Sequence, residues 1–175
     1  VDAPAQYTPY AATEDLGGAR WLRVDDLTPG STLATWYTVD RSPILAVTAD
    51  LQQLRDGQPP VMSLPTGALT GPAPEQRTAP LSNLAEAGDT GRCDDLLAAA
   101  PETIADGYTR VDAASPHTVA WSAPGRDAIV LRCGVAEPEN YGPGARLDQV
   151  NGIPWFEDVK LANGTTASTW YAMGR

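Results

Sequence analysis

Short hydrophobic runs rich in β-branched and aromatic residues recur along this chain, and Gly, Pro or Asp separates them. Three such runs lie at 20–24, 33–39 and 44–48. This composition and these boundaries are typical of β-strands. Similar runs occur in the second half of the chain, at 119–122, 128–133, 155–159 and 167–172. The run at 128–133 is nearly all apolar, which predicts a central strand.

Turn signals join four of these strands into two hairpins. The sequence Thr-Pro-Gly-Ser at 28–31 lies between the first two runs, and Ala-Asn-Gly-Thr at 162–165 lies between the last two. Asn-Gly favours a hairpin because both residues tolerate positive φ. We therefore expect two β-hairpins, each with a Trp near the start of one strand and a Trp-Tyr pair on the other.

One helix is expected at 92–100. Asp89 or Thr90 is positioned to cap its first amides, and acidic residues follow in the first turn, where the helix dipole favours negative charge. Three consecutive alanines near its end have high helix propensity. Pro101 is expected to end this helix, or to start a second short turn that runs through Ile104.

A repeat relates the two ends of the chain. Shifted by 134 positions, residues 1–41 fall on residues 135–175 without a gap, and 14 of these 41 pairs are identical. Four of the five Trp residues belong to such pairs: Trp21 with Trp155, and Trp36 with Trp170. The first copy continues into 42–49, beyond the point that corresponds to Arg175. We expect either a longer natural chain or two partial copies that complete one another.

These features predict an α+β fold, in which one antiparallel sheet contains both related hairpins (1–41 and 135–175) and one or two short helices lie on one side. Composition divides the chain into three parts. Residues 1–50 form a partial repeat copy that consists of a hairpin and a closing strand. Residues 51–80 are rich in Pro and Gly and predict a linker. Residues 81–175 form the second copy.

Charge and hydropathy exclude several classes of partner. The formal net charge is −10, which argues against binding to nucleic acid or to an anionic lipid surface. No window approaches 18 consecutive apolar residues, so we expect no transmembrane segment. The chain does not begin with charged residues followed by an apolar stretch, so we expect no signal peptide in it. Because it begins at Val1 without Met, we expect a processed or trimmed chain.

Several motifs in the second half resemble one family. They are Cys-Asp-Asp-Leu-Leu-Ala-Ala-Ala-Pro at 93–101, Ala-Trp at 120–121, Ile-Val-Leu-Arg-Cys-Gly-Val at 129–135 with Pro138, and Val-Asn-Gly-Ile-Pro-Trp at 150–155. In these motifs the chain resembles the actinobacterial family catalogued as domain of unknown function 3515. The resemblance covers residues 90–175, with a partial repeat at 1–50. Ser122 departs from the pattern, since the family tends to have Gly there.

The resemblance implies a location and a covalent link, but no activity. Members of the family are generally secreted or anchored in the cell envelope. The resemblance supports a disulfide between Cys93 and Cys133, which would staple the helix to the sheet and require an oxidising compartment outside the cytoplasm. Two free buried thiols are the alternative.

The residues that could carry catalysis do not form a recognisable set. His117 is the single His, and Ser115 lies two positions away along a loop, a poor arrangement for a catalytic triad. No hydrolase or metalloprotease motif and no phosphate-binding loop is present. The adjacent pairs Asp25-Asp26 and Asp94-Asp95 could touch calcium, but neighbouring side chains point apart. We expect no cofactor and no metal site, and we interpret the acidic residues as a solvated surface.

The aromatic pairs are the candidate binding residues. Trp36 and Tyr37 are adjacent, as are Trp170 and Tyr171, so the members of each pair project to opposite faces of a strand. One member of each pair could anchor a partner, whereas core packing of all four repeat Trp residues is the alternative. We expect a non-enzymatic extracytoplasmic module that binds a protein, as an accessory subunit or factor of an envelope or membrane complex. A small-ligand or glycan-binding domain is the second hypothesis, and an uncharacterised hydrolase the third.

Overall fold

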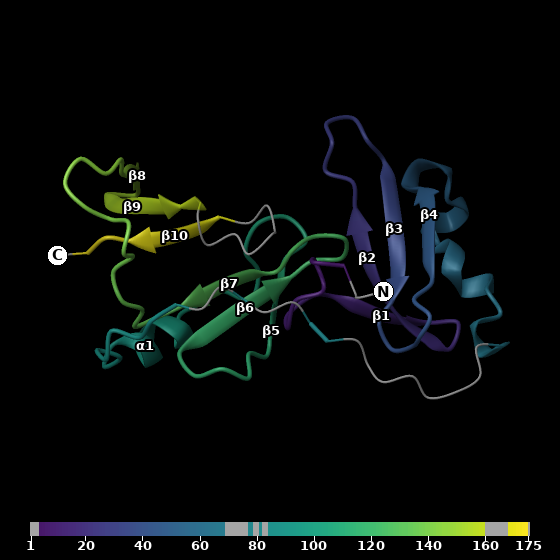
Figure 1. The fold of residues 1–175 in the computed structure, drawn as a ribbon, viewed down its shortest axis with the longest axis horizontal. Helices are drawn as coiled ribbons and strands as arrows, with labels where there is room; N and C mark the ends of the chain where they lie inside the picture. Colours follow the sequence, from purple (N-terminus) through teal and green to yellow (C-terminus); the bar gives the residue numbers. More distant parts are fainter. Residues whose placement is uncertain (1–3, 69–76, 79–80, 82–83, 160–167, 175) are drawn as a thin grey trace.

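The described part of the chain folds into three antiparallel sheets, one short α-helix and a series of 3-10 turns (Figure 1). The computed structural model describes residues 4–68, 77–78, 81, 84–159 and 168–174. The expectation of an α+β fold is wrong, because the architecture is mainly β and closer to a β-sandwich. The two hairpins also lie in different sheets and not in one.

The first sheet contains four strands in sequential order. They are β1 (Thr13–Leu16), β2 (Ala19–Asp25), β3 (Leu33–Thr38) and β4 (Ala46–Asp50). The last three correspond to the predicted strands at 20–24, 33–39 and 44–48. Strand β1 was not predicted, since Thr-Glu-Asp-Leu is short, polar and mostly exposed.

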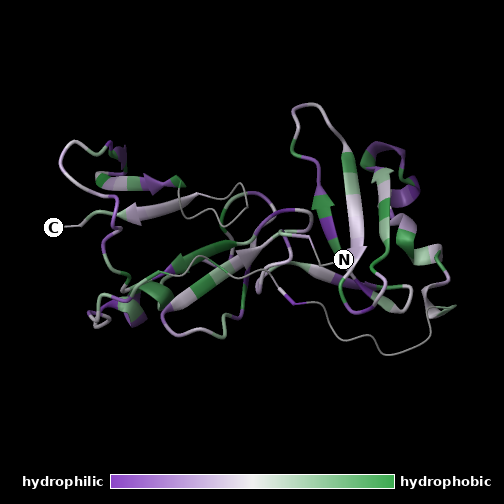
Figure 2. Ribbon diagram, in the orientation of Figure 1, coloured by the Kyte–Doolittle hydropathy of each residue, from purple (hydrophilic) through white to green (hydrophobic). Residues whose placement is uncertain are grey.

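One face of this sheet is buried under the segment that follows β4. Trp21 and Trp36 are 0% and 1% exposed, and they form a core with Val61. Four 3-10 turns supply the cover: η1 (Leu51–Gln53), η2 (Arg55–Gly57), η3 (Pro60–Ser63) and η4 (Thr66–Ala68). Figure 2 shows hydrophobic positions on these turns and on β3 and β4. Residues 51–68, part of the expected linker, therefore pack on the first sheet.

The second sheet has the order β5-β6-β7. Its strands are β5 (Thr109–Val111), β6 (Thr118–Ser122) and β7 (Ile129–Arg132). The central strand is β6, which is buried at four of its five positions, and β7 lies at an edge. The prediction that 128–133 is a central strand is therefore wrong. The apolar composition of β7 is explained by packing from other elements onto its faces, since all four of its residues are half-buried.

Helix α1 spans only Cys93–Ala98 and is held by contacts from other elements. Neither predicted side-chain cap forms at its first amides: the N-cap position is Arg92, and Asp89 accepts a hydrogen bond from the Gly91 N–H instead. Arg110 of β5 donates to the carbonyl oxygens of Leu97 (3.2 Å) and Ala100 (2.9 Å). A six-residue helix is marginal on its own, so these contacts and the attached sheet stabilise it.

The buried indole of Trp121 fixes the segment after α1 against β6. Its Nε1–H donates to the Pro101 carbonyl oxygen over 2.8 Å, and the side chain is 2% exposed. Residues 101–104 do not form the second helical turn that the sequence allowed. Thr103 instead forms an isolated antiparallel bridge with Thr109.

The third sheet repeats the first three strands of the first sheet in the same register. It consists of β8 (Asp148–Val150), β9 (Ile153–Asp158) and β10 (Thr169–Ala172), in the order β10-β9-β8. Trp21 lies opposite Thr38, and Trp155 lies opposite Ala172, which is the same pair shifted by 134 positions. Leu22 with Tyr37 likewise corresponds to Phe156 with Tyr171.

The turn that precedes each repeat is also reproduced. The Tyr7 N–H donates to the Pro4 carbonyl oxygen over 2.9 Å, and the Tyr141 N–H donates to the Pro138 carbonyl oxygen over 3.0 Å. The sequence repeat is therefore a structural repeat down to single hydrogen bonds. A fourth strand equivalent to β4 is not found in the third sheet within the described residues.

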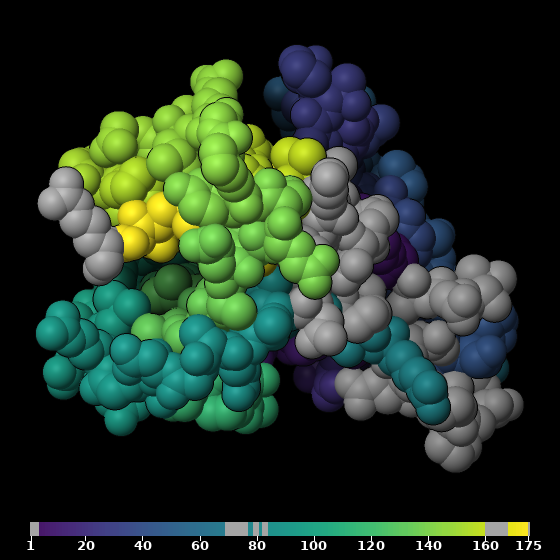
Figure 3. All heavy atoms as spheres, turned by 60° about the vertical axis from the view of Figure 1, so that its left-hand side comes forward, coloured from purple at the N-terminus to yellow at the C-terminus, as the bar shows by residue number. Residues whose placement is uncertain are grey.

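The second sheet lies between the two copies along the molecule (Figure 1). The Asp25 N–H at the end of β2 donates to the Gly125 carbonyl oxygen over 2.9 Å, and Val24 forms a parallel bridge with Gly125. On the other side, the third sheet lies over the segment that carries α1 and β7, as Figures 1 and 3 show.

Candidate functional site

The third sheet exposes one of its faces, which we call the outer face and define by Val150, Ile153, Trp155, Glu157 and Trp170. Pairing in register places these side chains on the same side, because Val150 lies opposite Ile153, and Glu157 opposite Trp170. Val150 is 52% exposed, and Ile153 and Trp170 are each 46% exposed. Large apolar side chains that gather on one exposed surface commonly mark an interaction site.

In the first copy of the repeat, the equivalent face is covered. Trp36 corresponds to Trp170, and its indole is almost wholly buried, beside Val47 of β4 and beneath apolar side chains of the 3-10 region. Ala19, which corresponds to Ile153, is 3% exposed. In the third sheet the apolar positions are retained, but the described residues provide no comparable cover.

The opposite face of the third sheet, the inner face, is packed. The rings of Phe156 and Tyr141 meet edge to face, with centroids 5.3 Å apart. Asp158 is 4% exposed and accepts a hydrogen bond from the Asn140 amide over 3.1 Å. Burial raises the pKa of the Tyr171 hydroxyl; the Asp158 carboxylate raises it further, and Arg132 acts in the opposite direction.

The structure separates the four candidate aromatic anchors. Trp36 and Tyr171 are buried, Tyr37 is half-buried and Trp170 is exposed. Adjacent residues do face opposite sides, as expected. The buried member is Trp36 in the first copy and Tyr171 in the second. The first sheet has a buried cluster on each face, whereas the described residues of the third sheet pack on the face of Tyr171. Trp170 is therefore the candidate anchor that the geometry leaves available.

Two apolar residues of the outer face were not predicted from the sequence. Val150 belongs to the short strand β8, which was not predicted, and Ile153 starts β9 before the predicted boundary at 155. The internal repeat contains the information needed to predict that both lie on an apolar face. Leu16 and Ala19 are their counterparts, and both contribute to the hydrophobic core around Trp21.

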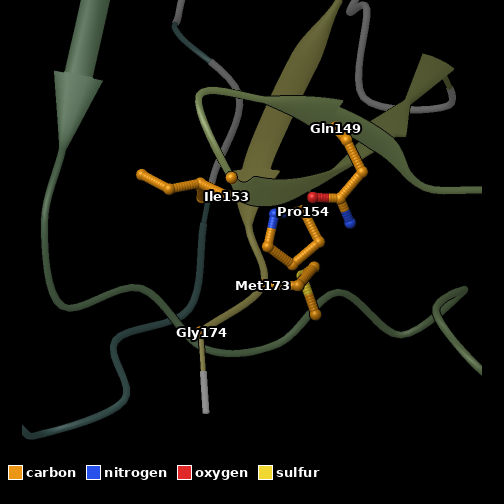
Figure 4. A pocket seen from close by; sticks show the side chains of 6 residues that line it. Gln149, Ile153, Pro154, Met173 and Gly174 are labelled. Carbon is orange, nitrogen blue, oxygen red and sulfur yellow. The ribbon is translucent and has the colours of Figure 1, made fainter.

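A hollow of about 490 Å³ opens beside the third sheet, at the end of β10 (Figure 4). Gln149, Pro154 and Met173 gather around it, and the side chain of Ile153 points away from them. Gly152 and Gly174 complete the lining, which contains neither an aromatic ring nor a charged group. A site of this composition offers no platform for stacking a sugar ring.

The residues considered for catalysis are not arranged as a triad. Ser115 accepts a hydrogen bond from the Tyr10 hydroxyl over 3.4 Å. Among the residues that the structure describes, no hydrogen bond joins the side chains of Ser115 and His117. The same residues contain no group of three or more His, Cys, Asp or Glu side chains able to hold a metal ion.

The paired aspartates considered for calcium join no group of three possible ligands among the described residues. Asp25 forms a two-pronged ion pair with Arg23, with N–O distances of 2.6 and 2.9 Å. Asp26 accepts hydrogen bonds from the Thr28 N–H and hydroxyl, and the Thr28 and Ser31 hydroxyls lower the pKa of its carboxyl. Asp94 and Asp95 lie in the exposed first turn of α1.

The two cysteines are joined as the resemblance implied. The Sγ atoms of Cys93 and Cys133 are 2.10 Å apart, and the bond connects the start of α1 to the residue after β7. Gly134 follows with φ of +74°, and a Cβ atom there would meet the Thr90 methyl group at 2.8 Å. The Cys-Gly sequence therefore allows the chain to turn closely against the start of α1.

The family model described as "Protein of unknown function (DUF3515)" matches residues 1–67 and residues 61–175. The chain belongs to the DUF3515 family. The two matches meet at 61–67, within the 3-10 turns that cover the first sheet, and together they include every residue of the chain. No curated protein and no solved structure gives a significant match to this DUF3515 chain. None of its described helices is both long and apolar enough to cross a membrane.

Proposed function

We propose that this DUF3515 chain is a non-enzymatic, extracytoplasmic protein-binding module, which acts as an accessory subunit or factor of an actinobacterial cell-envelope or membrane complex. The observation that carries the proposal is the outer face of the third sheet. It holds Trp170, Ile153 and Val150 half-exposed on regular strands. Aromatic and aliphatic side chains on a rigid platform are the usual anchors of protein interfaces.

Two further features support the proposal. The Cys93–Cys133 disulfide is compatible with an oxidising compartment outside the cytoplasm. The formal net charge of −10 disfavours nucleic acid and anionic lipid as the partner of an exposed apolar face. An exposed apolar face of this kind is suited to contact with another protein surface.

Comparative affinity capture tests the proposal. The tagged chain is expressed in an actinobacterial host, the envelope is solubilised gently, and co-purifying proteins are quantified by mass spectrometry. Three baits are compared: the wild type, the double variant Ile153→Ser/Trp170→Ala, and the control Leu27→Ala. Leu27 is 73% exposed and lies in the first copy, outside the outer face.

We expect a stoichiometric protein with the wild type and with Leu27→Ala, and at least tenfold less of it with the double variant. A partner that all three baits retain equally would show that the outer face is not the binding surface. A chain that purifies alone from the host envelope would contradict the proposed function.

A further inference from the structure

Helix α1 belongs to a segment, residues 88–100, that is attached to the second sheet on both of its flanks. Before the segment, the Ala87 N–H donates to the Gly134 carbonyl oxygen over 2.8 Å. After it, the Arg110 N–H donates to the Glu102 carbonyl oxygen over 2.8 Å. We call residues 88–100 the flap. Because these two attachments lie outside the flap, other contacts hold the flap itself in place.

Four apolar side chains share one face of the second sheet. Val119 of β6 lies opposite Leu131 of β7, and Trp121 lies opposite Ile129, so all four project to the same side. Val119 and Trp121 are each 2% exposed, and the two side chains from β7 are half-buried. We call this set of four residues the apolar face.

The groups that hold the flap project from the same side of the sheet. Cys133 follows Leu131 by two positions, and its N–H donates to the His117 carbonyl oxygen over 2.9 Å, so the pairing of the two strands continues to it. Arg110 lies opposite Trp121, and its guanidinium donates to two carbonyl oxygens near the end of the flap. The flap, which is bonded to Cys133 and to Arg110, therefore covers the apolar face.

The disulfide is the principal attachment of the flap. Among the six described residues of α1 only Cys93 is buried, and Leu96 is 49% exposed. A helix of this length is marginal on its own. Without the bond to Cys133, the described contacts leave a loop that is attached on both flanks and is held over the sheet mainly by Arg110.

We propose that the Cys93–Cys133 disulfide is a redox switch, whose reduction opens the flap and uncovers the apolar face while the three sheets stay folded. The two attachments outside the flap and the pairing of β5, β6 and β7 are backbone hydrogen bonds, which reduction leaves in place. Opening of this kind is local unfolding of one short segment. The switch does not rest on the proposed protein-binding function, and it uses no residue of the third sheet.

The burial of the two cysteines indicates how a small dithiol would reduce the bond. Cys93 is 1% exposed and Cys133 is half-buried, so a thiolate reaches the Cys133 sulfur more readily. Its attack forms a mixed disulfide and releases Cys93 as a thiolate. The second thiol of the reductant then displaces Cys133 and closes a cyclic disulfide. Two electrons pass to the protein, and the two thiol protons of the reductant end on the cysteines.

Amide hydrogen exchange with and without dithiothreitol tests the switch in the 175-residue chain. Alkylation of quenched samples followed by mass spectrometry shows the extent of reduction. Exchange is compared between peptides that cover α1 and peptides that cover β2 and β3. We expect the amides of α1 to exchange at least tenfold faster after reduction, with unchanged exchange in β2 and β3. Reoxidation should restore slow exchange in α1.

Hydroxyl-radical footprinting tests whether the apolar face becomes accessible. The wild type is compared with Cys93→Ser/Cys133→Ser, so that no reductant is needed. Trp121 reports on the apolar face, and Trp36 is the internal control, because it is buried in the first sheet and lies in a different tryptic peptide. We expect labelling of the Trp121 indole to rise at least fivefold in the variant, and labelling of Trp36 to stay at the wild-type level.

Arg110→Met separates the disulfide from the second attachment of the flap. This change removes both hydrogen bonds from the guanidinium and keeps an unbranched side chain at that position. In the oxidised chain we expect exchange in α1 to stay close to the wild-type rate, because the disulfide still holds the flap. Exchange in the oxidised variant that is as fast as in the reduced wild type would show that Arg110, and not the disulfide, keeps the flap closed.

Three further results would overturn the switch. A disulfide that resists dithiothreitol in the native chain, or slow exchange of α1 after reduction, would make the bond a permanent link. Faster exchange throughout β2 and β3 would show that reduction unfolds the whole chain. Unchanged labelling of Trp121 in a folded Cys93→Ser/Cys133→Ser variant would show that the apolar face stays covered. If that variant does not fold, exchange in the reduced wild type decides.

Discussion

Trp36 and Trp170 occupy the same position of the repeat, yet Trp36 is 1% exposed and Trp170 is 46% exposed. Their strands have the same register with the preceding strand, so the difference does not arise from local structure. It arises because β4 and the 3-10 turns pack around Trp36, whereas no described residue covers Trp170 in the same way. The pair therefore offers a test in which one residue type at one structural position is buried in one copy and accessible in the other.

Substitution of these two tryptophans should have unequal effects on stability. Trp36→Ala removes a fully buried indole and should lower the free energy of unfolding by about 3–5 kcal/mol. Trp170→Ala removes a half-exposed indole and should cost less than about 1 kcal/mol. Urea unfolding followed by far-ultraviolet circular dichroism measures both. Equal losses would mean that Trp170 is buried in solution, and the outer face would then be covered.

Loss of the disulfide should destabilise the chain without changing its topology. Cys93 and Cys133 are 40 positions apart, and closure of a loop of that length contributes roughly 3–4 kcal/mol in the chain-entropy model. The double variant Cys93→Ser/Cys133→Ser should therefore unfold at lower urea than the wild type. Iodoacetamide provides the control: it should label neither cysteine in the native chain without reductant, and labelling would show that the thiols are free.

Gly125 is expected to be sensitive to a single added methyl group. Its φ is +80°, and a Cβ atom there would lie 2.3 Å from the Asp25 carboxylate, which is held by Arg23. Gly125→Ala should cost about 1–3 kcal/mol more than Gly144→Ala, whose φ is +86° and whose surroundings are open. Because both glycines have positive φ, comparison with Gly144→Ala removes the cost of that backbone conformation. Equal losses of unfolding free energy in the two variants would mean that the Asp25 side chain moves away from the added methyl group at little cost.

Asp127 should make stability depend on pH in an unusual direction. Its Oδ1 atom is buried without a hydrogen-bond partner in the described structure, and burial raises the pKa of the carboxyl. A raised pKa means that ionisation of Asp127 disfavours the folded state, and that its protonation relieves this penalty as the pH falls through the raised value. Asp127→Asn should therefore raise the urea midpoint at pH 7 and give little gain near pH 4. An equal increase of the urea midpoint at pH 7 and at pH 4 would mean that the effect comes from packing of the amide and not from ionisation of Asp127.

The sequence predicted local structure well where two signals agreed. Strands β2, β3 and β9 combine β-branched or aromatic residues with clear turn signals, and each formed within a few residues of its predicted bounds. Strands β1 and β8 were missed because both are short and mostly polar. Their pairing depends on the long strand that follows each of them, and composition within a short window does not contain that information.

The fold class and the candidate site depended on tertiary contacts that no local pattern encodes. The helix at 92–100 shortened to Cys93–Ala98, and Pro-rich residues 51–68 folded back as 3-10 turns on the first sheet. Alternation of side chains predicted that Trp170 and Tyr171 face opposite sides. Which of them is exposed depends on the elements packed against the sheet, so only the structure could select Trp170.

The second sheet contacts both copies of the repeat. Gly125 bonds to the end of β2, and Arg132 of β7 lies within electrostatic reach of Tyr10 in the first copy and Tyr171 in the second. The covered and the uncovered hairpin are thus two ends of one connected body. Trp36 and Trp170, which share one position of the repeat, therefore lie on separate sheets that the second sheet connects.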